Sequence, residues 1–517
     1  MTWTARSGRA AAAAALLLQL LLRSGPAAAQ VAAEGAPPTL PAASPSLPGD
    51  HWAVRAATRA KELGLTTRYL PAQRAVPRAA VGEALREASL AALGRDPELA
   101  GLARGWYARF TEEFRETAAG TSPTGLLGSA VGAGYERRGG DVEPGAGLFE
   151  RRTGVTYLPL RSTLVASASL AGALTPGLAA VADPRVTDDG LALPRWDAIA
   201  GWGPVALSVG EEAVGYGPAF GGGIVLSGAA TLPRVEVQTS RPVEFPGVLR
   251  ILGSGAFHTF VTRLDERRHP GNPYLWGMRV VVQPHPRLTF GGSRASIFGG
   301  DSVTTPVTAG SVGRMLLGIL TEDFENQVVA AEFRYRLPTE SVLPITLYLE
   351  WGADDGSGAW WDVPGRVAGA FVPAVPGLPA VAAGFEYASF APLCCGNPSW
   401  YTHAGQPGGW VAKGAILGHP LGGEGREFLL YGQADLLDAR LRLDARAFRR
   451  ERGRKGYDLF LRAGNLFAPE RAGWSSGGAV EGLWRANRRT EVRAVLFREV
   501  GSGWRTHALD LNASLLF

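Results

Sequence analysis

The chain has 517 residues, of which 46% are hydrophobic and 19% charged, and its formal net charge is +5. Its two cysteines, Cys394 and Cys395, are adjacent, which excludes a disulfide framework, and its interleaved charges disfavour a nucleic-acid partner. Beyond the first thirty residues no run of eighteen apolar residues occurs, so helical membrane spans are excluded.

The N-terminal residues 1–29 have the organisation of a secretory signal peptide. Two arginines precede the apolar stretch Ala10–Leu22, which is too short to span a bilayer, and three alanines then offer a small-residue cleavage site. An uncleaved anchor helix is the alternative. Residues 30–49 are rich in Pro, Ala and Ser, which predicts an extended or disordered linker.

A small helical region is predicted over residues 50–120. Apolar residues recur at helical spacing after Asp50, which is placed to cap the first helix, and Pro77 can open a second one. A third segment carries Trp106 and Phe110 on one face. These helices are expected to pack as a cap against a larger domain.

From Leu126 onward the pattern changes to a period of two, which is typical of strands with one apolar and one polar face. In Leu441–Phe448, for example, Leu443 and Ala445 alternate with Arg442 and Asp444. The polar faces repeatedly combine Arg with Asp or Glu, a density that suits an enclosed interior where charges pair. Turn residues separate the segments.

Residues 126–517 are therefore predicted to form a mainly β transmembrane antiparallel barrel of about 16–18 strands in the outer membrane of a diderm bacterium, because only a closed barrel satisfies backbone groups in lipid without helices. Its partners would include outer-membrane lipid and lipopolysaccharide. The last strand closes on Phe517. By resemblance to outer-membrane barrels, this ending is expected to be recognised by the barrel-insertion machinery; the alternative is a soluble β protein.

One stretch is more specific. GYGPAFGGGIVLS (Gly215–Ser227), the following PRVEV (Pro233–Val237) and GMRVVVQPHPRLTFGGSR (Gly277–Arg294) resemble the capsule assembly Wzi family. That resemblance implies an eighteen-stranded outer-membrane barrel with a plugged lumen. It also implies a noncatalytic, lectin-like protein that binds and retains capsular or extracellular polysaccharide at the cell surface.

Sugar binding needs aromatic faces and polar groups, and two loop segments offer both. The candidate polysaccharide-binding residues in these loops are Asp354, Asp355, Trp360, Trp361, Asn397, Trp400, Tyr401 and Trp410. The aromatic residues among them can equally belong to the girdle at the membrane interface. Arg267 and Arg268 form a basic cluster that can hold an anionic sugar or a lipopolysaccharide phosphate, or can be a solvated turn.

Catalysis has little support in the sequence. Glu211 and Glu212 are adjacent, so they cannot both flank one glycosidic bond, and neither GxSxG nor HExxH spacing occurs. We expect no enzymatic activity, no cofactor and no metal. A porin or transport channel of the outer membrane is the main alternative function, and a membrane-embedded hydrolase is the second.

Overall fold

The computed structural model describes residues 41–114, 124–126, 128–141, 161–264, 268–319, 324–354, 359–390, 400–403, 405–413, 415–453 and 472–517. Its helices are α2 (Trp52–Glu62), α3 (Arg78–Ala91), α4 (Pro97–Glu113), α6 (Ala309–Leu316), α7 (Ala359–Asp362) and a 3-10 helix (Gly247–Leu252). Among the described residues, none of these helices combines the length and the apolar character that a bilayer crossing requires.

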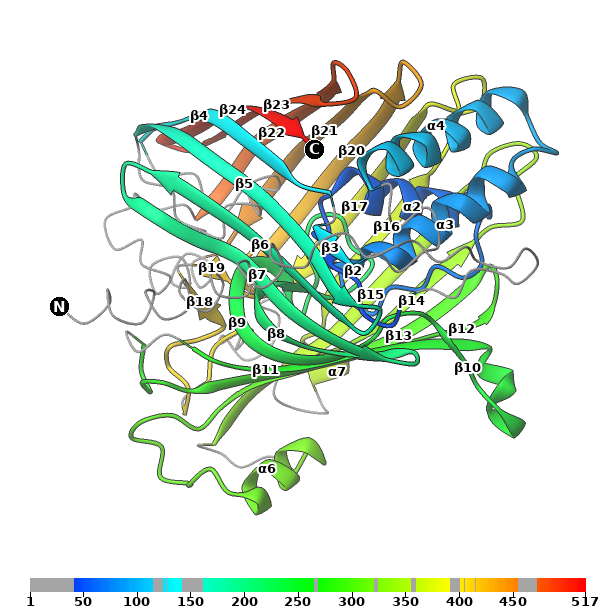
Figure 1. Ribbon diagram of the computed structural model, residues 1–517. Coiled ribbons are helices and arrows are strands. Elements are labelled where there is room, and N and C mark those ends of the chain that lie inside the picture. Colours follow the sequence, from blue (N-terminus) through cyan, green and yellow to red (C-terminus); the bar gives the residue numbers. More distant parts are fainter. Residues whose placement is uncertain are drawn as a thin grey trace.

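The main structure is a closed antiparallel β-barrel (Figure 1). Its eighteen ring strands are β4 (Ala130–Gly140), β5 (Ser162–Thr175), β6 (Leu178–Thr187), β7 (Gly190–Trp202), β8 (Val205–Gly215), β9 (Ser227–Thr239), β11 (Ser254–Arg263), β12 (Tyr274–His285), β13 (Leu288–Phe298), β14 (Glu325–Arg336), β15 (Thr346–Asp354), β16 (Gly365–Val372), β17 (Val381–Phe390), β20 (Gly425–Leu436), β21 (Leu441–Arg452), β22 (Gly473–Arg485), β23 (Thr490–Gly501) and β24 (Trp504–Leu516). Pairing of β24 with β4 closes the ring. The predicted fold class, with about 16–18 strands, is confirmed.

Six two-residue strands complete the described β-structure. They are β1 (Ser46–Leu47), β2 (Val76–Pro77), β3 (Gly125–Leu126), β10 (Val243–Glu244), β18 (Val411–Ala412) and β19 (Ala415–Ile416). Of these, β1 pairs with β2 and β18 pairs with β19, whereas β3 and β10 extend the barrel sheet.

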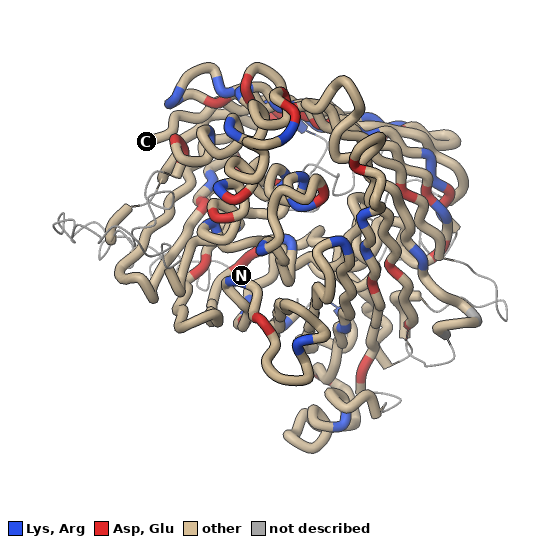
Figure 2. Tube along the Cα trace, turned by 90° about the vertical axis from the view of Figure 1, so that its right-hand side faces the viewer, with Lys and Arg blue, Asp and Glu red and all other residues tan. Residues whose placement is uncertain are grey.

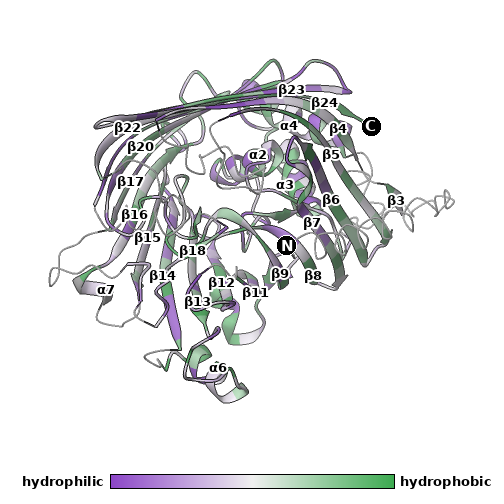
Figure 3. Ribbon diagram, turned by 90° about the vertical axis from the view of Figure 1, so that its left-hand side faces the viewer, coloured by the Kyte–Doolittle hydropathy of each residue, from purple (hydrophilic) through white to green (hydrophobic). Residues whose placement is uncertain are grey.

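The two faces of the barrel wall have the reverse of the polarity found in a water-soluble protein. Outward side chains are apolar and exposed, as with Leu430 at 59% and Leu496 at 58% exposure. Inward side chains are charged and buried, as with Arg442 at 2% and Glu350 at 0%. Figure 2 marks the many charged positions along the wall, and Figure 3 shows apolar and polar residues alternating along the strands. The alternation thus matches a hydrocarbon exterior and a polar interior.

The helical region lies inside one end of the ring, where Figures 2 and 3 both place it. Arg59 of α2 donates to the Pro373 carbonyl (2.6 Å) and to the Asp435 carboxylate (2.9 Å). Arg109 of α4 donates to the Ala439 carbonyl (2.7 Å) and to Glu491 (2.9 Å). These helices therefore fill a barrel opening, held by arginines that reach the wall and its turns.

The start of α2 differs from expectation. His51, not Asp50, is its N-cap, and the His51 ring nitrogen accepts from the Ala53 N–H at 3.2 Å. The indole of Trp52 donates to Glu113 at 2.8 Å, which anchors Trp52 against α4 and leaves His51 in the capping position. The start of α4 follows the usual pattern, with Asp96 as N-cap and Pro97 in the first turn.

The two ends of the barrel differ in their connections. The helix-filled end, here called the short-turn end, has tight turns at 176–177, 203–204 and 286–287. The opposite end carries the longest connections, 299–324 and 391–424, and is called the long-loop end. Because sequential strands are antiparallel, the remaining connections alternate between these two ends along the chain.

Candidate functional site

Three segments converge at the long-loop end. Arg268, in the β11–β12 connection, donates to the carbonyls of Val411 (2.6 Å) and Gly409 (2.7 Å) in the β17–β20 connection. The side-chain amide of Gln406, in the same connection, donates to the Gly299 carbonyl at 3.0 Å. This hydrogen bond links the β17–β20 connection to the β13–β14 connection. Side chains far apart in sequence thus hold these connections in one assembly.

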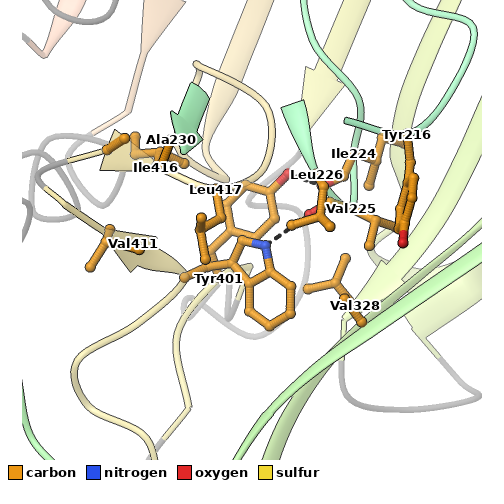
Figure 4. Close-up of a cluster of buried hydrophobic side chains, with 14 of the residues drawn as sticks. Tyr216, Ile224, Val225, Leu226, Ala230, Val328, Tyr401, Val411, Ile416 and Leu417 are labelled. Atoms are coloured by element: carbon orange, nitrogen blue, oxygen red, sulfur yellow. Dashed lines mark hydrogen bonds between the residues drawn. The ribbon is translucent and has the colours of Figure 1, made fainter. Parts of the chain in front are cut away.

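The described part of the β17–β20 connection packs inside the barrel against the Gly-rich segment (Gly215–Ser227). Tyr401 donates its hydroxyl proton to the Ile224 carbonyl at 2.6 Å, and the Trp410 indole donates to the Val225 carbonyl at 2.9 Å. Figure 4 shows Tyr401 and Leu417 beside Ile224–Leu226, and all of these residues belong to one buried hydrophobic cluster. Burial raises the pKa of the Tyr401 phenol, so the hydroxyl remains a hydrogen-bond donor.

Two glutamates of the wall hold the Gly-rich segment from the other side. Glu386 of β17 accepts from the backbone N–H groups of Phe220 (2.7 Å) and Gly221 (2.9 Å), and Glu350 of β15 accepts from the Ile224 N–H (2.8 Å). Glycine is required at Gly217 because its φ is +82° and an added Cβ would collide with the Glu350 carboxylate. Sequence reasoning singled out this segment but not its glutamate partners.

The structure brings two of the predicted loop segments together. Asp354 ends β15, and its carboxylate accepts from the backbone N–H of Tyr401. The Trp400 indole donates to the Val363 carbonyl at 2.8 Å, which adds a second link between these segments. Trp400, Tyr401 and Trp410 are all buried, so their rings contact protein.

Trp360 and Trp361 lie in α7. The Trp360 carbonyl accepts from the Trp351 indole at 2.8 Å, and the Trp361 ring lies 6.2 Å from the Trp351 ring. Trp361 is 80% exposed, and Trp351 shares its strand face with the outward Leu347 and Leu349. This position fits the girdle interpretation of Trp361. Its part in sugar binding remains a prediction.

Three predicted site residues, Asp355, Asn397 and Arg267, lie outside the described residues, as do Cys394, Cys395 and the proposed signal peptide. Of the remaining seven, Asp354, Trp400, Tyr401, Trp410 and Arg268 direct polar atoms to backbone groups of neighbouring segments. In this arrangement they build the framework of the long-loop end. Their role in polysaccharide binding stays a prediction.

Comparisons with known proteins agree with this architecture. A family model described as "Capsule assembly protein Wzi" matches residues 188–496. Among solved structures, Wzi of Escherichia coli, an outer membrane protein involved in group 1 capsule assembly and a carbohydrate-binding β-barrel, is similar with a TM-score of 0.67 and 14% identity over 89% of this chain and 97% of that chain. OpdL of Pseudomonas aeruginosa gives a TM-score of 0.44 and 12% identity over 75% of this chain and 98% of that chain. None of the curated proteins matches this sequence.

Proposed function

Because this chain belongs to the capsule assembly protein Wzi family, we propose that it binds capsular or extracellular polysaccharide and retains it at the cell surface without chemical turnover. The observation that carries the proposal is the span of the family match. Residues 188–496 include the Gly-rich segment and all three connections that converge at the long-loop end. The chain is an outer-membrane β-barrel, which places a surface-facing end within reach of such a ligand.

The long-loop end is the proposed outer surface. Outer-membrane barrels carry short turns on the periplasmic side and longer loops outside. By this rule the helices of the short-turn end face the periplasm, and the connections around Arg268, Trp361 and Trp400 face the medium. The apolar exterior would contact lipid and lipopolysaccharide. The barrel-insertion machinery would recognise β24 with its terminal Phe517.

Retention of a polymer requires many weak contacts on a rigid support, because one bound sugar unit raises the effective concentration of the next unit at its own contact. The hydrogen bonds between connections supply such a support. The sugar contacts themselves are proposed for the candidate residues named from sequence, with Trp361 the most accessible described aromatic ring among them.

Binding of the purified barrel to polysaccharide released from its own cells tests this proposal. In detergent, immobilised protein should bind the polymer saturably, and Trp361→Ala should weaken binding if that ring stacks on sugar. Trp202→Ala is the matched control because Trp202 is also exposed, at 58%, but lies beside the short-turn end. Absence of saturable binding by the unchanged protein would defeat the proposal.

A porin is the alternative of another class. Helices α2–α4 occupy one opening of the barrel, and the Gly-rich segment and the residues around Tyr401 occupy its interior. We therefore expect no steady conductance in a planar bilayer, and steady ohmic channels would favour the porin. Release of reducing ends or fatty acids by the purified protein would favour a hydrolase instead.

A further inference from the structure

A cavity of about 180 Å³ lies within the barrel, between α2, the residues that follow it and the Gly-rich segment. This volume is more than ten times the minimum of roughly 10–15 Å³ that one water molecule needs. Its walls include Lys61, Arg74 and Gly217–Phe220. It is therefore separate from the connections that converge at the long-loop end.

Most cations that line this cavity already have a carboxylate partner. Arg279 forms two hydrogen bonds with Glu332, at 2.6 and 2.7 Å, and Arg334 pairs with Glu62. In the same way, Arg55 lies 2.8 Å from Asp444. These pairs balance their own charges.

Lys61 and Arg74 are different. Neither forms an ion pair with any carboxylate among the described residues, and the Arg74 guanidinium donates to the Ala219 carbonyl instead. Both side chains are half-buried. Glu62 acts on Lys61, and Glu350 and Glu386 act on Arg74, from beyond ion-pair distance. Both cations can therefore still take a negatively charged occupant as a direct partner.

Two neutral groups that line the same cavity are incompletely hydrogen-bonded. The buried Gln73 side-chain oxygen has no hydrogen-bond partner within the described part of the chain, and the buried Tyr69 hydroxyl faces only the Thr58 side chain, without a well-formed hydrogen bond. Both residues line the cavity. Buried polar groups are normally satisfied, so a ligand with hydroxyl groups or acidic oxygens would complete them.

We propose that this cavity binds an oxyanion, either the carboxylate of a single acidic sugar or inorganic phosphate, between Lys61 and Arg74. Charged hydrogen bonds from an ammonium and a guanidinium suit both anions. The Tyr69 hydroxyl and the Gln73 oxygen then meet the hydroxyl groups of the sugar or a protonated oxygen of the phosphate. The site lies away from the proposed polysaccharide surface and goes beyond the function proposed for it.

Charges of both signs surround the site. Burial lowers the pKa of Lys61 to about 7; Glu62 raises it, and Arg334, Arg279 and Arg336 lower it further. Glu332 also lines the cavity, and Glu350 and Glu386 act on Arg74. A bound anion would favour the protonated amine, so affinity for an anion of constant charge should fall as pH rises through 7.

Isothermal titration calorimetry of the detergent-solubilised barrel tests the site with inorganic phosphate, glucuronate and uncharged glucose. The unchanged protein should bind one or both anions saturably and glucose at least about tenfold more weakly, which corresponds to about 1.4 kcal/mol. Binding of phosphate alone identifies a phosphate site, and binding of glucuronate identifies an acidic-sugar site. No saturable anion binding, or equal affinity for glucose, would overturn the proposal.

Variants connect the binding to the cavity. Lys61→Gln should weaken anion binding about tenfold or more, whereas Lys413→Gln, which changes a lysine at the long-loop end, should not. Should Lys61→Gln fail to fold, Tyr69→Phe removes a single hydroxyl that lines the cavity and should keep the barrel intact. Unchanged anion affinity in the folded Lys61→Gln variant, or in Tyr69→Phe when that variant is the one measured, would contradict the proposed site.

Discussion

Replacing Leu496 by arginine would place a charge in the outward apolar face of the barrel. Leu496 lies near the middle of β23, is 58% exposed, and pairs across the sheet with Val480 and Leu509. An arginine at the bilayer midplane costs roughly 2–4 kcal/mol of folding free energy in outer-membrane barrels. We expect Leu496→Arg to lose stability in that range, because the guanidinium must leave water for hydrocarbon.

The measurement is reversible denaturant unfolding of the barrel in lipid vesicles, followed by tryptophan fluorescence. Leu437→Arg is the control: Leu437 is 64% exposed but lies in the β20–β21 turn, where the cost should stay within about 1 kcal/mol. Equal losses at the two positions, or a loss under about 1 kcal/mol at Leu496, would refute a hydrocarbon-facing wall.

Three further perturbations probe the interior. Glu386→Gln should weaken the charged hydrogen bonds that hold the Gly-rich segment, worth about 1.5–3 kcal/mol each, and accelerate hydrogen exchange at the amides of Phe220 and Gly221; unchanged exchange would speak against this anchor. Arg442→Met removes the partner of Asp435 (3.1 Å) and Asp444 (2.9 Å) and should cost about 3 kcal/mol in denaturant unfolding, whereas Arg505→Met at the exposed rim should change little; similar losses would argue against a buried ion-pair network. Burial, followed by the charges of Arg450, Arg74 and Arg452, lowers the pKa of His419 to about 3, below its value in an unfolded chain. When the segment around His419 opens, the imidazole binds a proton that the folded form does not bind. The folded form should therefore lose up to about 1.4 kcal/mol of stability per pH unit as pH falls from about 6.5 towards 3. Protease cleavage within 400–424 should therefore rise in acid, and a response that His419→Gln leaves unaltered would exclude His419 as its source.

The barrel wall could be predicted from sequence because its information is local. Leu443 and Arg442 are neighbours, and the period of two alone assigns one to lipid and the other to the interior, where the structure finds them. The C-terminal strand follows the same rule, with Leu511 exposed and Asp510 buried. Such alternation repeats often enough to identify the fold class.

The interior could not be predicted in the same way, since its contacts join distant residues. Tyr401 finds its acceptor Ile224 across 177 positions, and Arg59 finds Asp435 across 376. A loop rich in aromatic residues has the same sequence pattern whether its rings stack on a sugar or pack on a glycine-rich segment. No period in the sequence records which of the two occurs, so the inward folding of residues 400–424 had no sequence pattern to predict it.

Deletion of the gene, with complementation by the unchanged chain, tests polysaccharide retention most directly. Cell-bound and released polysaccharide are measured separately in the deletion strain and in the complemented strain. The account predicts that deletion moves polysaccharide from the cell fraction into the medium while the total stays constant, and that complementation reverses the shift. An undiminished cell-bound fraction after deletion would contradict it.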